Sequence, residues 1–429
     1  MKNTIKNIIL ENQNSELPEF ELRDIDIPLD LGIIISLIGA RRSGKTYILY
    51  QIIQALLKNN IKKEQILFLN FEDERLMLTH ENLDEIIQAY QELYPDLELK
   101  NVYLFFDEIQ NISGWEKFIR RIYDTKTRHI YITGSNSKLL STEIATELRG
   151  RTLSFTIFPL NFSEYLKFNQ VETNFNTQKN KSKILHFAKK YMIDGGFPEI
   201  VFYDSKNRVR LLQQYFNVMI FRDIIERYKI NSPETLKFFI KKIFSNVTKP
   251  FSVNKTYNDL KSLGYSISNK YLYEYLDHCN TIFLTQSINK FNYSEIKQEK
   301  SDKKTYIIDN GLLSAIEFSV SENNGKLFEN MVVMEFLKAE KQIFYFKEYY
   351  ECDLIVKENE IYKPIQISYS INDIETRERE QKGVYEACKF LNVNKATIIT
   401  FDQEEQLIFK NIEIQIIPFY KYFLSQLKL

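Results

Sequence analysis

Short continuous apolar runs recur in the first third of the chain, with helical patterns between them. Residues 31–38, 102–106 and 129–133 are runs of this kind, typical of strands that are buried on both faces of a parallel sheet. Residues 47–57 and 109–124 instead have apolar side chains at helical spacing. Strands that alternate with helices in this way predict an α/β fold with a parallel sheet.

The segment Gly-Ala-Arg-Arg-Ser-Gly-Lys-Thr at residues 39–46 directly follows the first apolar run. Its glycines let successive backbone N–H groups point into one concavity, so the segment predicts a phosphate-binding P-loop. We expect Lys45 to reach the β and γ phosphates of ATP and Thr46 to bind Mg²⁺. A Gly-Ser turn with a surface lysine is the alternative, which the flanking strand and helix disfavour. The residues predicted to bind the nucleotide are Gly39, Arg41, Arg42, Ser43, Gly44, Lys45, Thr46 and Tyr47.

Two acids follow the run at 102–106 and predict a Walker B site. Asp107, at the tip of a strand beside the P-loop strand, can hold Mg²⁺, and Glu108 can activate the attacking water as a general base. The alternative is that both acids only cap the helix at 109–124. The run at 129–133 ends in Gly-Ser-Asn-Ser at the sheet edge where ligands bind, so Asn136 or Ser135 is expected to sense the γ-phosphate. A plain turn is the alternative there.

Together with residues 67–76, these segments resemble a family of prokaryotic ATPases related to the AAA and STAND groups. The resemblance implies an ATPase core, a winged helix and a fold similar to PD-(D/E)xK nucleases. It also implies that Arg149 and Arg151, just before a predicted closing strand at 153–160, neutralise transition-state charge in their own or a neighbouring subunit. Surface solvation is the alternative role for both arginines. The expected segments are a P-loop ATPase core at 1–160, a helical lid at 161–230, a winged helix at 231–318 and a nuclease-like domain at 319–429.

Composition indicates a soluble multi-domain protein of 429 residues, of which 44% are hydrophobic. The 57 basic residues balance the 57 acidic ones, so the chain as a whole has no field that attracts nucleic acid or lipid. Its three cysteines are far apart, which argues against disulfides or a zinc site and fits a reducing compartment. The apolar runs are far shorter than a membrane span. We therefore expect a cytoplasmic protein with no membrane partner.

The segment at 232–300 contains ten lysines, no arginine and six acids, a local basic excess. Three helical patterns followed by two strand-like ones predict a winged helix here. The residues on its third helix are Lys270, Tyr271, Tyr273 and Tyr275. Such a helix can enter a DNA groove while lysines contact phosphates, although the lack of arginine disfavours base reading. A plain packing module is the alternative.

The resemblance implies that nuclease domains of this type bind metal through acids on a helix and a hairpin, and through an acid and a lysine on the next strand. Glu329 and Asp353 match the first two positions, but Gln366 and Ser368 occupy the others. Gln366 has no charge to hold a metal, and Ser368 has no ammonium. We therefore expect an inert nuclease relic that binds DNA, a protein partner or another copy of the chain.

Three functions follow from these predictions. The first is an Mg²⁺-dependent ATPase that couples its nucleotide state to a DNA- or partner-binding C-terminal half. The second is an ATP-dependent nuclease that acts in DNA defence. The third is a STAND-type nucleotide switch with little turnover.

Overall fold

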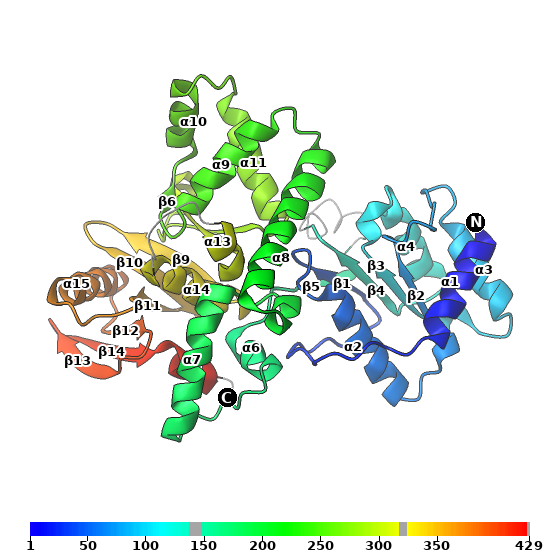
Figure 1. Ribbon diagram of the computed structural model, residues 1–429, viewed down its shortest axis with the longest axis horizontal. Coiled ribbons are helices and arrows are strands. Elements are labelled where there is room, and N and C mark those ends of the chain that lie inside the picture. Colours follow the sequence, from blue (N-terminus) through cyan, green and yellow to red (C-terminus); the bar gives the residue numbers. More distant parts are fainter. Residues whose placement is uncertain (137–147, 149, 317–323, 427–429) are drawn as a thin grey trace. The chain divides into compact units, whose positions relative to one another are not determined.

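The computed structural model describes residues 1–136, 148, 150–316 and 324–426. The chain forms two compact units (Figure 1). The first comprises Met1–Phe158 with Thr281–Phe283, and the second comprises Pro159–Asn280 with Leu284–Leu429. The first unit therefore covers nearly the same residues as the predicted ATPase core, whereas the three segments predicted after residue 160 share one unit.

A parallel five-stranded sheet lies at the centre of the first unit, in the order β2-β3-β4-β1-β5. The strands are β1 (Ile34–Ile38), β2 (Ile66–Asn70), β3 (Tyr103–Asp107), β4 (Ile130–Gly134) and β5 (Thr152–Thr156). Every residue of β1, β3 and β4 is buried, as expected for strands covered on both faces. The predicted α/β fold with a parallel sheet is confirmed.

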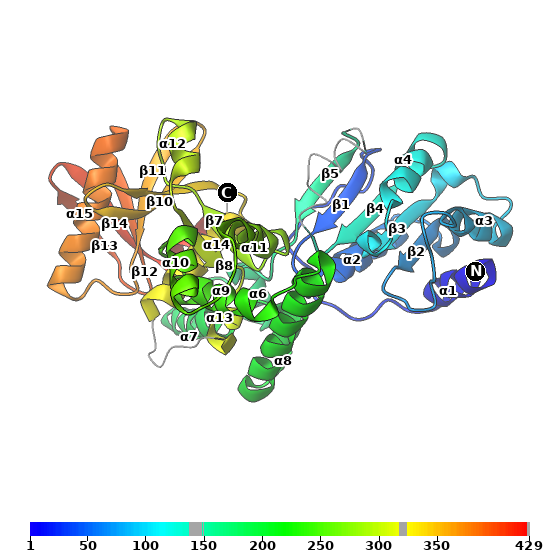
Figure 2. The ribbon, with the colours of Figure 1, turned by 90° about the horizontal axis from the view of Figure 1, so that it is seen from above.

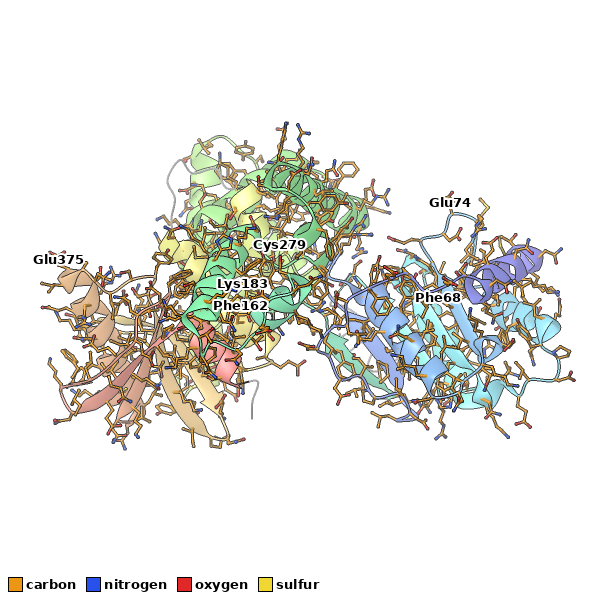
Figure 3. The ribbon with its side chains drawn as sticks, turned by 60° about the horizontal axis from the view of Figure 1, so that its bottom comes forward. Phe68, Glu74, Phe162, Lys183, Cys279 and Glu375 are labelled. Carbon is orange, nitrogen blue, oxygen red and sulfur yellow. The ribbon has the colours of Figure 1, made fainter. Side chains whose placement is uncertain are left out.

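Helices pack on this sheet through its alternating side chains. The helices are α1 (Lys2–Asn14), α2 (Lys45–Lys58), α3 (Asp84–Leu93) and α4 (Trp115–Thr125). One core cluster joins β1 to α2 and includes Leu37, Ile52 and Phe68, which is labelled in Figure 3. Phe106 of β3, which alternates with the strand residues of that cluster, packs instead on Phe118 of α4, with ring centroids 6.1 Å apart.

The helix predicted at 109–124 is wrong at its beginning. A 3₁₀ turn spans Ile109–Asn111, and α4 begins only at Trp115. Gly114, with φ 78°, precedes the helix in the left-handed region, which breaks the helical path and suits a residue without Cβ. Asp107 and Glu108 therefore do not cap α4.

Helices dominate the first part of the second unit. They are α6 (Phe162–Phe168), α7 (Gln178–Asp194) and α8 (Ser205–Val218), with a 3₁₀ turn at Pro198–Phe202 and a π-helix at Met219–Glu226 that continues α8. Gly195 ends α7 at φ 80°. A Cβ on Gly195 would lie 1.9 Å from Asp309 Oδ1, so only glycine fits this close approach.

A small antiparallel sheet with strand order β6-β8-β7 follows these helices along the chain. Its elements are α9 (Pro233–Ser245), β6 (Pro250–Phe251), α10 (Val253–Ser262), α11 (Asn269–Thr281), β7 (Thr285–Ile288), α12 (Glu295–Lys300), β8 (Lys303–Ile307) and α13 (Asn310–Ile316). The three predicted helices and two predicted strands are all present, and β6, α12 and α13 are additional.

A mixed six-stranded sheet, in the order β13-β14-β12-β11-β10-β9, ends the second unit. Its elements are α14 (Asn324–Lys338), β9 (Gln342–Lys347), β10 (Glu351–Glu358), β11 (Ile361–Ile367), α15 (Ile374–Leu391), β12 (Lys395–Thr400), β13 (Glu405–Phe409), β14 (Ile412–Pro418) and α16 (Phe419–Gln426). Helix α15 packs on β10, β11 and β12 (Figure 2). Gly383 of α15 permits this packing, because a Cβ there would lie 2.3 Å from Glu351 O.

Within the part of the chain that the structure describes, no helix is both long enough and apolar enough to span a membrane.

Candidate functional site

The loop between β1 and α2 has the backbone of a phosphate cradle. Gly39 has φ 155°, and a Cβ on it would lie 2.1 Å from Ile157 O, so no other residue fits without a shift of the backbone. Gly44 is left-handed at φ 98° and immediately precedes α2. The buried Ser43 hydroxyl has no hydrogen-bond partner among the described residues. A buried hydroxyl of this kind is expected to meet a ligand or water.

Lys45 begins α2 and is 4% exposed. Its Nζ donates hydrogen bonds to Gly39 O at 3.2 Å and Ala40 O at 3.1 Å. The same nitrogen lies 3.3 Å from Glu108 Oε1. Lys45 thus lies across the loop, and its three bonds with carbonyl and carboxylate oxygens can be exchanged for phosphate oxygens.

Asp107 is joined to the P-loop helix by its carboxylate. Thr46 Oγ1 donates to Asp107 Oδ2 at 2.8 Å, and Thr133 Oγ1 donates to Asp107 Oδ1 at 2.6 Å. The prediction that the Asp107 strand lies beside the P-loop strand is wrong, because β4 lies between them. Thr133 lies at the carboxyl end of β4 and bonds Asp107 from this intervening strand, and Thr46 still reaches the other oxygen of the same carboxylate.

Glu108 is 7% exposed and has a left-handed backbone at φ 53°, an uncommon conformation for a residue with a side chain. Thr133 Oγ1 accepts a hydrogen bond from Glu108 N at 2.9 Å. Gln110 Nε2 donates to Glu108 Oε2 at 2.5 Å and approaches Ser135 Oγ at 3.4 Å. A strained backbone held by its neighbours is typical of functional positions.

The two adjacent acids differ in their electrostatics. Burial, and then the charge of Glu108, raise the pKa of Asp107 to about 6. Burial alone would raise the pKa of Glu108, but the Lys45 charge and the Gln110 hydrogen bond outweigh it and lower that pKa below its ordinary value. Glu108 is therefore ionised at neutral pH, as a general base must be.

The remaining predicted residues of this site are placed as follows. Asn136 is 7% exposed and Ser135 1% exposed, both just beyond the carboxyl end of β4. Arg41 forms an ion pair with Glu72 at 2.6 Å. Arg42 is exposed and left-handed at φ 64°. Tyr47 is 48% exposed and packs edge-on against Phe20.

Arg151 is not in the nucleotide site of its own chain. Its carbonyl accepts a hydrogen bond from Ile34 N at the beginning of β1, whereas the P-loop follows the end of that parallel strand. The guanidinium pairs with Asp124 at 3.0 Å and lies 5.6 Å from the centre of the Tyr123 ring. The full length of β1, about 15 Å at 3.3 Å per residue, separates it from the cradle. Arg149 lies outside the described residues.

Arg23 is a residue that the sequence analysis missed. It is 7% exposed, and its guanidinium donates to Ser43 O at 3.0 Å and Phe158 O at 3.1 Å. Gln51 of α2 holds the Arg23 backbone through bonds of 2.9 and 3.1 Å. Arg23 thereby ties the P-loop to the chain that leaves β5. No local motif marks Arg23, whereas Thr133 is recognisable as a polar residue at the end of an apolar run.

The four residues of the nuclease-like constellation lie near one another in the second unit, together with a cation that was not predicted. Lys304 Nζ of β8 lies 3.2 Å from Glu329 Oε1 and 3.1 Å from Asp353 Oδ1. Gln366 Oε1 accepts from Asp353 N at 3.2 Å, and Gln366 Nε2 donates to the buried Glu380 of α15 at 2.5 Å. Ser368 donates to Ser370 O at 3.0 Å.

The third helix of the small sheet exposes only part of its predicted surface. Tyr271 and Tyr273 are 54% and 50% exposed, and the Lys270 side chain is 84% exposed. Tyr275 is instead 5% exposed and packs on Phe239 of α9. Tyr275 therefore belongs to the core and not to a binding surface.

The residues of the first site fit a nucleotide with Mg²⁺. In phosphate sites Mg²⁺ is bound by one or two carboxylates together with the phosphates and water, and the Thr46 hydroxyl and Asp107 carboxylate form such a donor set. Gly39 lets the backbone turn closely around a phosphate, and among the described residues the Ser43 hydroxyl has no partner and can bond a phosphate oxygen. Among residues 1–136, 148, 150–316 and 324–426, no group of three or more His, Cys, Asp or Glu side chains is arranged to hold a metal alone.

This fold and site are those of a P-loop ATPase core. Residues 32–166 match the family model of an AAA domain, and residues 186–323 match a domain of unknown function, DUF8612. The uncharacterized protein MJ1544 of Methanocaldococcus jannaschii is 36% identical in an alignment over 423 residues that covers 94% of this chain and 91% of that protein. The chain therefore belongs to the same family as MJ1544.

A second relative is an uncharacterized protein of Haemophilus influenzae, which is 29% identical over 389 residues, or 90% of this chain and 93% of that protein. Among solved structures, the Aeropyrum pernix Orc1 protein in complex with DNA matches 73% of this chain and 89% of its own, at 11% identity and a TM-score of 0.28. A likeness at this TM-score has no bearing on fold or function here.

Proposed function

We propose that this protein binds ATP with Mg²⁺ at the P-loop, hydrolyses it, and couples its nucleotide state to a DNA- or partner-binding second unit. The observation that supports this most directly is the 2.8 Å hydrogen bond from Thr46 Oγ1 to Asp107 Oδ2. It joins residues 61 positions apart in the sequence, and these are the two side chains that a Walker-type magnesium site requires.

Each residue of the site has a distinct role in this proposal. The backbone N–H groups around Gly44 and the ammonium of Lys45 bind the phosphates, while Thr46 and Asp107 hold Mg²⁺. The bound metal supplies charge neutralisation at the phosphates. Glu108 accepts a proton from the attacking water, and Asn136 beyond β4 is placed at the same edge to sense the γ-phosphate.

The ion pair between Lys45 and Glu108 has a consequence for the timing of hydrolysis. Lys45 lies 3.3 Å from one carboxylate oxygen of Glu108, and Gln110 donates to the other oxygen. Phosphate competes with Glu108 for the lysine, so nucleotide binding frees one oxygen of the base. Gln110 acts as a positioning residue that keeps the freed carboxylate at the sheet edge.

Phosphate release by the wild type and by Glu108→Gln tests hydrolysis. We expect Glu108→Gln to lower release at least about a hundredfold, as loss of a general base does, with ATP affinity retained. Glu98→Gln is a matched control, because Glu98 is 65% exposed and pairs with Lys100 at the surface. Equal and negligible release by all three proteins would contradict an ATPase and favour a nucleotide switch.

The basis for DNA binding is the small three-stranded sheet with its three helices, which we interpret as a winged helix. Its third helix presents Lys270, Tyr271 and Tyr273 to solvent, a combination of cation and aromatic rings that suits nucleic acid. Fluorescence anisotropy with duplex DNA at low salt tests this. We expect Lys270→Glu to weaken binding and Tyr275→Phe, a change in the core, to leave it unchanged. No binding at low salt would reduce the segment to a packing module.

Nuclease activity is not supported by the second unit. Gln366 supplies no charge, and its amide already bonds Asp353 N and Glu380. Incubation of plasmid with the protein and Mg²⁺, with and without ATP, is expected to leave the plasmid intact. Cleavage that is lost in Asp353→Asn would overturn this conclusion.

A further inference from the structure

Arg41 of the P-loop is paired with an acid from the loop that follows β2. Its Nη1 donates to Glu72 Oε1 at 2.6 Å. Glu72 lies two residues beyond the end of β2, and its N–H donates to Asn70 Oδ1 at 2.8 Å. Phe71, which precedes Glu72, donates its N–H to Asp107 O at 2.9 Å. Glu72 is therefore fixed at the carboxyl edge of the sheet, beside the acids that end β3.

The strand order places the Arg41 guanidinium over those acids. The P-loop follows β1, whereas Glu72 follows β2, and the sheet has the order β2-β3-β4-β1-β5. Neighbouring strands are about 4.8 Å apart, so a side chain that joins the two loops passes over the ends of β4 and β3. Burial raises the pKa of Glu108, and the charges of Lys45 and Arg41 are among the causes that lower it below its ordinary value. Arg41 is therefore within electrostatic reach of the general base.

The ion pair of Arg41 with Glu72 can be exchanged for a pair with another anion. The two side chains are 18% and 40% exposed, and partly exposed ion pairs contribute little to stability. The γ-phosphate of ATP carries more negative charge than one carboxylate, and a guanidinium can donate two parallel hydrogen bonds to its oxygens. Bound ATP can therefore replace Glu72 as the partner of Arg41 at little cost.

Hydrolysis of ATP benefits from an arginine at this edge of the sheet. Negative charge develops on the oxygens of the transferred phosphoryl group, and a guanidinium that meets them accelerates the reaction strongly. Arg151 does not meet this need in its own chain, because it pairs with Asp124 near the beginning of β1. Arg23 is bound to the carbonyl oxygens of Ser43 and Phe158. Arg41, in contrast, extends over the edge that carries the general base.

We propose that Arg41 exchanges Glu72 for the γ-phosphate of bound ATP and stabilises the transition state of hydrolysis from within the same chain. In this reaction the oxygen of water bonds to the γ-phosphorus, and the bond from that phosphorus to the bridging oxygen breaks, so that ADP keeps the electron pair. Glu108 accepts the proton of the water, while the guanidinium neutralises charge on the γ-phosphoryl oxygens. This role rests on the proposed ATPase function, and it makes Glu72 a competitor of the γ-phosphate.

Phosphate release by Arg41→Gln tests the role in hydrolysis. We expect release to fall at least about a hundredfold, since an arginine that meets the transferred phosphoryl group contributes at least that much to turnover. Arg41→Lys keeps the charge but loses the paired donors, so its rate should be intermediate. Arg75→Gln is the matched control from the loop after β2, because Arg75 is exposed and pairs with Asp73 and Glu11. This control should hydrolyse ATP as the wild type does.

Nucleotide affinity gives a readout that does not depend on turnover. Calorimetry compares ADP, the non-hydrolysable analogue AMP-PNP, and ADP with aluminium fluoride, which resembles the phosphoryl group in transfer. Arg41→Gln should bind ADP within about threefold of the wild type, but the other two ligands at least about tenfold more weakly, because only they have a group at the γ position. Glu72→Gln removes the competitor and should bind AMP-PNP more tightly, with unchanged affinity for ADP. Opposite shifts from the two partners of one ion pair cannot result from a loss of folding.

A mixture of two inactive variants tests whether the arginine acts in its own chain. Lys45→Ala keeps Arg41 but lacks the ammonium that binds phosphate, whereas Arg41→Gln keeps Lys45. The mixture should be as inactive as its two components. Restored phosphate release would place Arg41 in the site of a neighbouring copy and would overturn its assignment to the same chain.

Three further results would overturn the proposal. Arg41→Gln that releases phosphate within about threefold of the wild-type rate would show that Arg41 has no role in turnover, and the proposed ATPase function would stand. Equal weakening of ADP and AMP-PNP binding by Arg41→Gln would show that the arginine does not distinguish the γ-phosphate. Wild type that binds nucleotide but releases no phosphate would contradict the ATPase function itself and, with it, the role of Arg41 in hydrolysis.

Discussion

Replacement of Asp107 by asparagine should stabilise the first unit at neutral pH while it destroys the metal site. Asp107 is 1% exposed, and its pKa is raised from 3.8 to about 6. The Asp107 carboxyl group therefore binds its proton more tightly in the folded protein than in the unfolded chain. The resulting contribution to stability is greatest below pH 4 and is lost as the pH rises toward about 6. The pKa difference corresponds to about 3 kcal/mol at pH 8 and less than about 1 kcal/mol near pH 4.

The substituted asparagine would be neutral at every pH and would keep the local hydrogen bonds. Its amide oxygen can accept from Thr133 Oγ1, and its NH₂ group can donate to Thr46 Oγ1, because a hydroxyl rotates to suit its partner. We therefore expect Asp107→Asn to exceed the wild type in unfolding free energy by up to about 3 kcal/mol at pH 8. The gain should nearly vanish at pH 4, and Mg²⁺-dependent hydrolysis should be lost.

Urea unfolding monitored by tryptophan fluorescence measures this effect in the first unit alone. The chain has one tryptophan, Trp115, which is 2% exposed in α4. Glu108→Gln is the matched contrast, because the pKa of Glu108 is lowered and its loss leaves Lys45 buried without its carboxylate partner. That variant should be less stable than the wild type at pH 8. Asp107→Asn that is no more stable than the wild type at pH 8 would refute the reasoning.

Three further predictions concern the same site. Binding of MgATP should release a proton at pH 6 but little at pH 8, because Mg²⁺ favours the ionised form of Asp107. Calorimetry in buffers of different ionisation enthalpy measures the number of protons released, and the same release by Asp107→Asn would contradict this prediction. Arg23→Ala should weaken MgATP binding about tenfold, since Ser43 O and Phe158 O lose their donor, whereas the exposed Arg75→Ala should bind as the wild type does. Arg151→Ala should leave phosphate release unchanged within about twofold, because its guanidinium pairs with Asp124 at the end of β1 away from the P-loop; a large loss would place this arginine in the site of a neighbouring copy.

Local sequence was sufficient where the chemistry depends on adjacent residues. The P-loop could be predicted because its glycines, Lys45 and Thr46 lie within eight positions, and the apolar runs identified the strands that flank it. Asp107 and Glu108 could be found because they follow a buried strand directly. The insertion of β4 between β1 and β3 could not be predicted, since strand order depends on packing between segments far apart in the sequence.

Dependence on packing between distant segments also explains why some site residues could not be placed or found from the sequence. The position of Arg151 follows from the parallel pairing of β5 with β1, which places the beginning of β5 opposite the P-loop edge. Arg23 acts on carbonyls 20 and 135 residues away. Lys304 meets acids 25 and 49 residues further along the chain, and it comes from a different sheet than Asp353. No periodicity or motif encodes such contacts.

The central claim is that ATP and Mg²⁺ lie between the P-loop and the acids at the end of β3. Titration calorimetry of the nucleotide-free protein with MgATP tests it most directly, with Lys45→Ala as the variant and Lys58→Ala, at the exposed far end of the same helix, as the control. We predict one ATP bound per chain by the wild type and by Lys58→Ala, and at least about a hundredfold weaker binding by Lys45→Ala, because buried charge-assisted bonds to phosphate are lost. Well-folded wild type that takes up no ATP, or Lys45→Ala that binds it equally well, would contradict the account.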